Sequence, residues 1–156
     1  MSEPVDAVDV RFERADASHV DVLAPLMRGF YAYEHLPWDE AAARGGLGMI
    51  LADASLGQVW LMRTEEGWAG YFVLAFSFSL EFRGRFGFLD ELYLRDDHRG
   101  RGLGRRAVDH AAEVCLGLGI RALRLEVTCD NAAARGFYAR LGFQDHGRDL
   151  LTRWVD

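Results

Sequence analysis

The segment 89–106 constrains the fold of this chain more than any other. It reads Leu-Asp-Glu-Leu-Tyr-Leu-Arg-Asp-Asp-His-Arg-Gly-Arg-Gly-Leu-Gly-Arg-Arg. The first six residues interleave apolar and polar types with a bias toward aromatic and branched side chains, which is typical of a strand. Three glycines then follow at every second position. From Leu103 onward, apolar residues recur at intervals of three and four, as on one face of a helix: Leu103, Ala107, Ala111, Val114 and Leu118. The segment therefore predicts a strand, a glycine loop and the start of a helix.

The glycine loop has the chemistry of a phosphate site. Glycines allow backbone N–H groups to approach a ligand closely, and the start of a helix adds partial positive charge. Four arginines surround the loop: Arg99, Arg101, Arg105 and Arg106. The P-loop pattern is excluded because it requires a lysine, and the dinucleotide pattern is excluded because Arg105 stands where its third glycine would be. A glycine-rich turn without any ligand is the alternative interpretation.

Two motifs resemble those of the GNAT N-acetyltransferase superfamily. Arg99-Gly-Arg-Gly-Leu-Gly104 matches the acyl-CoA loop pattern Gln/Arg-x-x-Gly-x-Gly/Ala of that superfamily at each defined position. Asn131-Ala-Ala-Ala-Arg-Gly-Phe-Tyr-Ala-Arg-Leu-Gly-Phe143 resembles its second signature, Asn-x-x-Ala-x-x-x-Tyr-x-x-x-Gly-Phe. The two motifs occur in the order and at the spacing that the superfamily shows. The resemblance covers about 86–143 of the chain.

The resemblance implies an α/β (α+β) fold. The expected architecture is one mixed, mostly antiparallel sheet of about seven strands, with helices on both faces and a splay between the fourth and fifth strands. We expect a single domain over 1–156. The other elements are expected as strands at 8–15, 57–62, 68–80, 89–94, 123–127, 143–146 and 150–155, and helices at 18–34, after Asp39, at 101–116 and at 131–141. Ser18 and Asp21 resemble a capping box at the start of the first helix.

The resemblance also implies acetyl-CoA as the cofactor. Its pantetheine arm would pair with backbone groups of the fourth strand, and its phosphates would meet the glycine loop. Asn131 would bond the cofactor arm, although an asparagine at that point also suits a helix N-cap. The expected cofactor-binding residues are Leu92, Tyr93, Leu94, Arg99, Gly100, Arg101, Gly102, Leu103, Gly104, Arg105 and Asn131.

Composition sets the remaining bounds. The chain has 156 residues and a net charge of −6, which opposes nucleic acid or an anionic membrane as a partner. No apolar run reaches the ~18 residues of a spanning helix and no signal sequence is visible, so we expect a cytoplasmic protein. The two cysteines, Cys115 and Cys129, lack metal-ligand or disulfide spacing and are expected to be packing residues. No metal site is expected.

Acetyl transfer from a thioester to an amine limits the catalytic candidates. An alkylamine is mostly protonated at pH 7, so a base must remove a proton before attack. Asp90 and Glu91 precede the splay, and many relatives place a carboxylate base there that often acts through water. Strand alternation would send their side chains to opposite faces, so only one could enter the site. We favour Glu91 over Asp90, with the Leu92 N–H as the donor to the oxyanion.

Tyr138 coincides with the tyrosine that acts as general acid in the superfamily, and a phenol pKa of ~10 suits a thiolate leaving group. A tyrosine that only packs beside the core is the alternative. Relatives line the acceptor pocket at positions that correspond here to Tyr31, Glu34 and His35, and Glu81 is a further candidate. Aromatic rings and carboxylates suit a small cationic amine such as a polyamine, diamine or amino sugar, and equally suit helix packing.

Other functions remain open at this point. A protein lysine or N-terminus is an alternative acceptor, and a sensor that binds acyl-CoA without turnover is an alternative class. A nucleic-acid-binding protein that uses the arginine cluster is opposed by the acidic net charge. The predicted closing hairpin, which carries Trp154, suggests a homodimer.

Overall fold

The computed structural model describes residues 8–156. The chain divides into two compact units, Met1–Glu126 and Val127–Asp156. The first unit contains the sheet and three α-helices, and the second contains one short helix.

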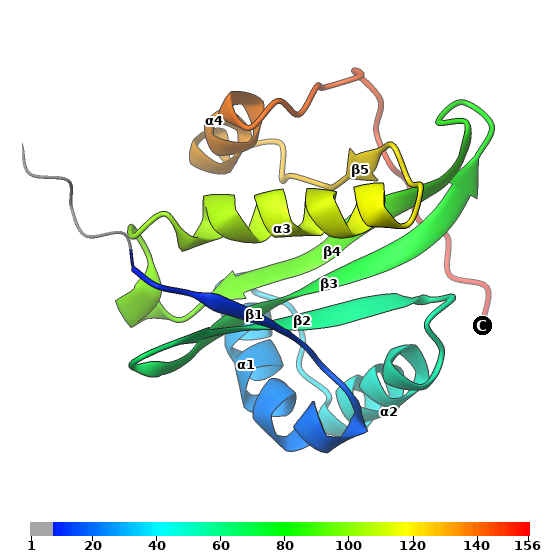
Figure 1. Ribbon diagram of the computed structural model, residues 1–156. Helices are drawn as coiled ribbons and strands as arrows, with labels where there is room; N and C mark the ends of the chain where they lie inside the picture. Colours follow the sequence, from blue (N-terminus) through cyan, green and yellow to red (C-terminus); the bar gives the residue numbers. More distant parts are fainter. Residues whose placement is uncertain (1–7) are drawn as a thin grey trace, which may run out of the picture. The chain divides into compact units, whose positions relative to one another are not determined.

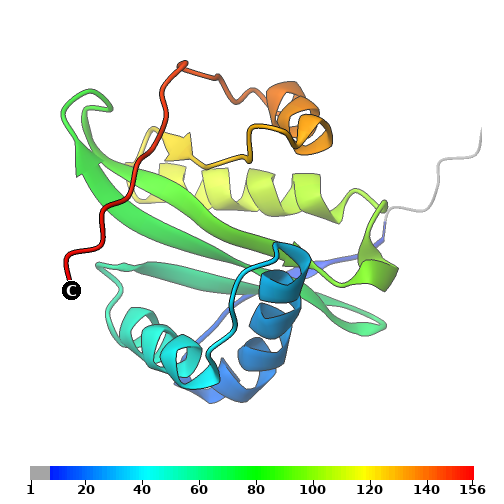
Figure 2. The ribbon, with the colours of Figure 1, turned by 180° about the vertical axis from the view of Figure 1, so that it is seen from behind.

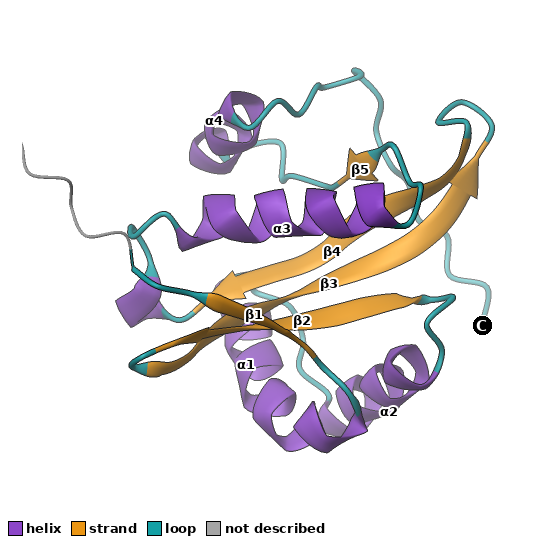
Figure 3. Ribbon diagram, viewed as in Figure 1, coloured by secondary structure: helices purple, strands orange, loops and turns teal. Residues whose placement is uncertain are grey.

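The first unit is built on a five-stranded sheet whose strands lie in chain order (Figure 3). The strands are β1 (Arg11–Arg14), β2 (Gly57–Thr64), β3 (Gly67–Ser79), β4 (Gly84–Leu94) and β5 (Leu123–Arg124). Neighbours are antiparallel from β1 to β4, whereas β5 runs parallel to β4. The sheet is therefore mixed and mostly antiparallel, as predicted.

Helices cover both faces of this sheet. α1 (Val20–Tyr33) and α2 (Glu40–Ala52) lie on one face, and α3 (Leu103–Gly117) lies on the other (Figures 1 and 2). Leu23, Leu26 and Met27 of α1 pack with Tyr71 and Val73 of β3 in one buried core. Each such side chain contributes about 1.5–3 kcal/mol of burial free energy, so the α1 face is firmly held against the sheet.

The start of α1 differs from the prediction. Asp16, rather than Ser18, is the N-cap residue, and it begins a 3₁₀ turn (Ala17–His19) that leads into α1. The Asp16 carboxylate accepts from the Ser18 N–H at 2.8 Å, and His19 completes the reciprocal pair. The Ser18–Asp21 capping box is therefore wrong, because the extra turn moves the cap two residues earlier. Asp39 does cap α2, accepting from the Ala42 N–H at 3.0 Å.

The apolar stripe of α3 is confirmed at Leu103, Ala107 and Ala111, which are buried. The next buried residue is Cys115, so the predicted packing role of this cysteine is confirmed. Leu118 is 45% exposed, because the helix ends at Gly117 and the chain turns away. Cys129 is exposed, so its predicted packing role is wrong.

The second unit contains α4 (Ala132–Arg140). Asn131 caps this helix by accepting from the Ala134 N–H at 3.1 Å, and Gly142 follows the helix with a φ of 93°. The predicted strands at 143–146 and 150–155 do not form in the described chain. A strand requires a paired neighbour, and the pairing of the sheet ends at Arg124. The sheet thus has five strands rather than about seven.

Candidate active site

A β-bulge shapes the middle of β4. Val73 of β3 pairs with Glu91 and the next residue, Leu74, pairs with Leu89, so Asp90 is the extra residue. A bulge inserts one residue and thereby reverses the alternation of side chains beyond it.

The neighbours of β4 locate this reversal. A Cβ on Gly87 would lie 2.5 Å from Cys115 Sγ, so Gly87 faces α3. A Cβ on Gly29 of α1 would overlap the Tyr93 hydroxyl, so Tyr93 faces α1. Regular alternation would put residues 87 and 93 on one face. The bulge instead turns both Asp90 and Glu91 toward α1 and α2. The prediction that they point to opposite faces is therefore wrong.

A cleft of about 350 Å³ lies on this face, between α1, α2, β3 and β4. Both bulge carboxylates line it, together with the carboxylate of the α2 cap. Most of the other lining side chains are apolar. The lining residues are Met27, Tyr31, Pro37, Asp39, Ala42, Ala43, Gly46, Leu47, Ile50, Val73, Asp90 and Glu91.

Glu91 is the best-anchored carboxylate in the cleft. It accepts hydrogen bonds from the Tyr71 hydroxyl at 2.7 Å and from the Tyr31 hydroxyl at 3.3 Å. Burial raises the pKa of Glu91, while the bond from Tyr71 opposes the rise and the charge of Asp90 adds to it. Burial and the Glu91 charge also raise the pKa values of both tyrosines, which keeps them protonated as donors. Glu91 is thus a fixed, partly desolvated carboxylate that can accept a proton.

Asp90 lies beside it and is more open to solvent. Partial burial raises the pKa of its carboxyl as well. Two neighbouring carboxylates with raised pKa values favour the uptake of a proton, or of a cation, at this point of the cleft.

The outer edge of β4 is open beyond the bulge. β5 pairs only with Gly87 and Phe88. The Arg95 N–H donates to Ala69 of β3, so the backbone groups of Leu92 and Leu94 point toward the unpaired edge. The Leu94 carbonyl accepts from Arg99 Nε at 3.0 Å. This edge lies where the family resemblance implies a splay between the fourth and fifth strands.

The glycine loop follows β4 and a 3₁₀ turn (Asp96–His98). Gly100 and Gly102 have φ values of 73° and 77°, a region that favours glycine. Gly102 is the N-cap of α3 and offers no side chain to satisfy the first-turn N–H groups. The first turn of α3 is therefore suited to an anion.

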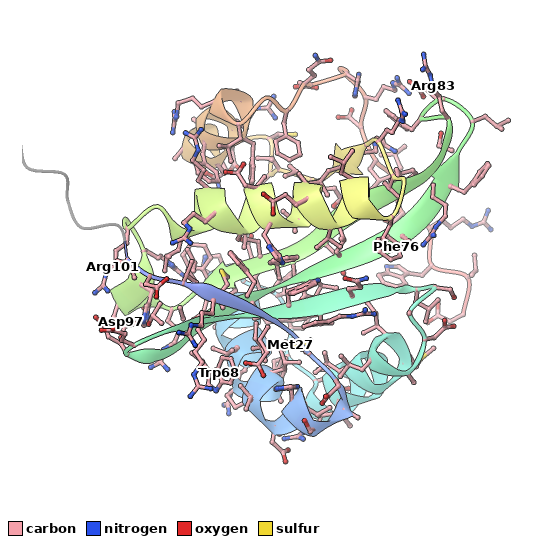
Figure 4. All side chains as sticks on the ribbon, viewed as in Figure 1. Met27, Trp68, Phe76, Arg83, Asp97 and Arg101 are labelled. Carbon is pink, nitrogen blue, oxygen red and sulfur yellow. The ribbon has the colours of Figure 1, made fainter. Side chains whose placement is uncertain are left out.

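The arginines of the loop are tied to neighbouring groups. Arg101 contacts Glu66 in the β2–β3 turn at 3.1 Å, and Arg99 lies 3.9 Å over the Tyr33 ring. Arg105 is exposed and lies 3.9 Å from Asp109. Figure 4 labels Arg101 near Asp97, at the end of the sheet that holds the β2–β3 turn.

Sequence reasoning missed His98 as a support for the loop. Its side chain is buried, with Nδ1 2.8 Å from Asp97 and Nε2 3.2 Å from the Thr64 hydroxyl. His98 thereby connects the residues before the glycine loop to the end of β2. A single histidine between charged residues gave no signal of this role, because its partner Thr64 is 34 residues away.

The remaining predicted residues lie in several places. Tyr31 lines the cleft, whereas Glu34 and His35, at the end of α1, do not. Glu81 is in the turn between β3 and β4 and does not line it either. In the second unit, the Tyr138 ring lies edge-on to its neighbours Phe137 and Phe143. The sequence identified neither Tyr71 as a partner of Glu91 nor Asp39 as a lining residue.

No group of three or more His, Cys, Asp or Glu side chains in 8–156 is arranged to hold a metal ion. None of the described helices has the length and apolar character needed to span a membrane.

The curated proteins described here to which the chain is similar are acetyltransferases. The thialysine N-epsilon-acetyltransferase of Bos taurus is 38% identical over 49% of this chain and 44% of its own length. An L-methionine sulfoximine/L-methionine sulfone acetyltransferase of Pseudomonas paraeruginosa is 28% identical over 76% of this chain and 66% of its own length. The chain thus spans about half to two thirds of these curated relatives.

Solved structures share the fold. An integron cassette protein from a salt-marsh metagenome has a TM-score of 0.82 and 34% identity, covering 93% of this chain and 90% of its own. An aminoglycoside N-acetyltransferase in complex with CoA has a TM-score of 0.81 at 12% identity, covering 96% of this chain and 97% of its own. The model of the acetyltransferase (GNAT) family matches residues 23–143. The chain therefore belongs to the GNAT acetyltransferase family.

Proposed function

We propose that this protein is an acetyl-CoA-dependent N-acetyltransferase that acts on the primary amine of a small cationic molecule. The observation that carries the proposal is Glu91, a carboxylate fixed by two tyrosines in a cleft beside the open edge of β4. Relatives named for acetylating thialysine and L-methionine sulfoximine support an amine acceptor.

The first unit offers two features that fit acetyl-CoA, which supplies the acetyl thioester when bound. The uncapped first turn of α3 and the positive φ values of Gly100 and Gly102 leave N–H groups for phosphates. The backbone groups of Leu92 and the Leu94 N–H pair with no neighbouring strand among residues 8–156 and fit an extended amide-bearing arm, while the Leu94 carbonyl is held by Arg99. Arg101 and Arg105 would add charge at the phosphates.

The proposed chemistry assigns one task to each group. Glu91 accepts a proton from the ammonium of the acceptor, directly or through a water. The freed amine nitrogen attacks the thioester carbonyl, and the Leu92 N–H donates to the negative charge that develops on the carbonyl oxygen. The carbon–sulfur bond breaks, and Tyr138 donates a proton to the departing thiolate. The nitrogen loses its second proton as the amide forms, and this proton restores the Tyr138 hydroxyl. The products are an N-acetylated amine and free CoA.

Release of the CoA thiol from acetyl-CoA in the presence of amines tests this proposal. We expect turnover, and we expect Tyr138→Phe to lower kcat by about 100-fold or more without changing acetyl-CoA affinity. Tyr33→Phe is the matched control, because it removes a hydroxyl from a tyrosine that is 57% exposed and does not line the cleft.

The two failures are separable. If Tyr138→Phe keeps the full rate, only the role of Tyr138 is contradicted, and the acetyltransferase activity stands. If acetyl-CoA binds but its thiol is not released in the presence of any amine, the proposed acetyltransferase activity is contradicted and an acyl-CoA sensor is favoured.

A further inference from the structure

The charge that lines the cleft is one-sided. Three carboxylates line it, those of Asp39, Asp90 and Glu91, and no Lys, Arg or His is among its lining residues. Within residues 8–156, none of the three carboxylates forms an ion pair. An ammonium group would therefore be attracted by charges that the protein leaves uncompensated, whereas a carboxylate would be repelled.

Apart from these carboxylates and Tyr31, the lining of the cleft is apolar. Met27, Leu47 and Val73 are buried core residues that also line it, and Met27 is labelled beside α1 in Figure 4. Ala42, Ala43 and Ile50 of α2 add further apolar surface. A sugar ring placed here would bury hydroxyl groups with few partners, which costs free energy for each unpaired group. An alkyl chain or an aromatic ring would instead gain from burial.

We propose that this cleft is the acceptor site and that it selects a primary amine carried on an apolar alkyl or arylalkyl body without a carboxylate. This inference rests on the proposed acetyl transfer. The ammonium lies at Asp90 and Glu91, beside the open edge of β4, and the apolar body lies against α1 and α2. The volume of about 350 Å³ is at the small end for ligand pockets and suits a compact amine. Amino acids and amino sugars are poor acceptors, in contrast to the amino-acid acceptors for which the two curated relatives are named.

Glycines of α2 provide a matched pair of variants. A Cβ at Gly46 or at Gly48 would meet no atom within 4 Å, so neither position resists a side chain. Gly46 lines the cleft and Gly48 does not. Gly46→Leu would therefore occupy space in the cleft, and Gly48→Leu controls for the same change in helix propensity.

The experiment measures kcat and KM for pairs of amines, one member with and one without a carboxylate or sugar hydroxyls, at saturating acetyl-CoA. Phenethylamine is compared with L-phenylalanine and cadaverine with L-lysine, because each pair differs only by the carboxylate. Cyclohexylmethylamine is compared with glucosamine. We expect kcat/KM to favour the first member of each pair by about 100-fold. Gly46→Leu is expected to raise KM for phenethylamine by about 10-fold, with Gly48→Leu unchanged and KM for acetyl-CoA unchanged in both.

Calorimetric titration of phenethylamine separates this inference from the proposed function. If no amine turns over but phenethylamine binds and Gly46→Leu weakens it, the acetyl transfer is wrong and the cleft assignment stands. If L-phenylalanine, L-lysine or glucosamine reacts as well as its partner, the selectivity is overturned while the enzyme stands. If Gly46→Leu changes neither binding nor KM, or if phenethylamine neither binds nor reacts, the cleft is not the acceptor site.

Discussion

Two carboxylates of the cleft, Asp90 and Glu91, and the glycine loop lie at the two ends of the segment 89–106. The cleft and the loop are nevertheless built in different ways. The loop presents backbone N–H groups at Gly100 and Gly102, and its arginines are partly exposed and paired with nearby carboxylates. The cleft presents side chains from four elements, and its carboxylates have no cationic partner among the described residues. Under the proposed function, local backbone geometry forms the site for the anionic phosphates, and long-range packing forms the site for the cationic amine.

Glu91→Gln is expected to have the largest effect on this contrast. The amide keeps the size of the side chain but cannot accept a proton from an ammonium, so kcat/KM should fall by about 100-fold or more. Steady-state kinetics with a responsive amine measures the loss, and calorimetry should show unchanged acetyl-CoA affinity. Asp90→Asn is the matched comparison and should lose less, because Asp90 lacks the tyrosine partners. A larger loss in Asp90→Asn would move the base to Asp90.

Gly102→Ala should act on the loop alone. Its φ of 77° is unfavourable for alanine, so we expect a loss of about 1–2 kcal/mol in unfolding free energy. Chemical denaturation measures the change. Gly117→Ala at the end of α3 is the control, since its φ is not positive and no atom would meet the new Cβ, and its stability should not fall. Equal losses in the two variants would contradict the strained geometry of the loop.

Tyr71→Phe should change the pH dependence of the cleft. The carboxylate of Glu91 is active when ionised, so kcat/KM falls as pH drops through its raised pKa. The Tyr71 hydrogen bond holds that pKa down. Removing the hydroxyl should therefore move the acid limb of kcat/KM to higher pH by about one unit.

Tyr31→Phe removes the longer of the two bonds to Glu91 and should move the acid limb less. A shift to lower pH in Tyr71→Phe would show that the catalytic base is not the carboxylate of Glu91.

Glu66→Gln should have the smallest effect. It releases Arg101 from a partly exposed ion pair, which is worth about 0.2–1 kcal/mol. Acetyl-CoA affinity should rise by about twofold at low salt, and the gain should shrink as salt screens the phosphates. Glu65→Gln removes the same charge from the neighbouring residue of the turn. An equal gain in both variants would assign the effect to net charge rather than to Arg101.

The sequence predicted the loop better than the cleft, because the loop depends on residues close in the chain and the cleft depends on packing between distant segments. Glycine spacing, the start of α3 and the cap at Asn131 depend on neighbours in the chain, so a local pattern identifies them. The bulge at Asp90 depends on the pairing of β4 with β3, and regular alternation gave the wrong face for one carboxylate. Tyr71 could not be connected with Glu91 because the two meet only across paired strands.

The prediction of two closing strands, at 143–146 and 150–155, was wrong for a related reason. Residues 150–155 have the composition of a strand, yet Leu150, Leu151, Trp154 and Val155 are exposed and unpaired in the sheet. Strand propensity describes a residue's fit to a packed, pleated surface, and it cannot supply the neighbour that a ladder requires.

The measurement that tests the central claim most directly is the stoichiometry of the products formed from acetyl-CoA and phenethylamine. Mass spectrometry would quantify the N-acetylated amine while a thiol reagent quantifies free CoA. We predict equal amounts of the two products, with both abolished when either substrate is omitted. Thiol release without acetylated amine would show that the protein hydrolyses the thioester, and it would contradict the assignment of the acidic cleft to an amine acceptor.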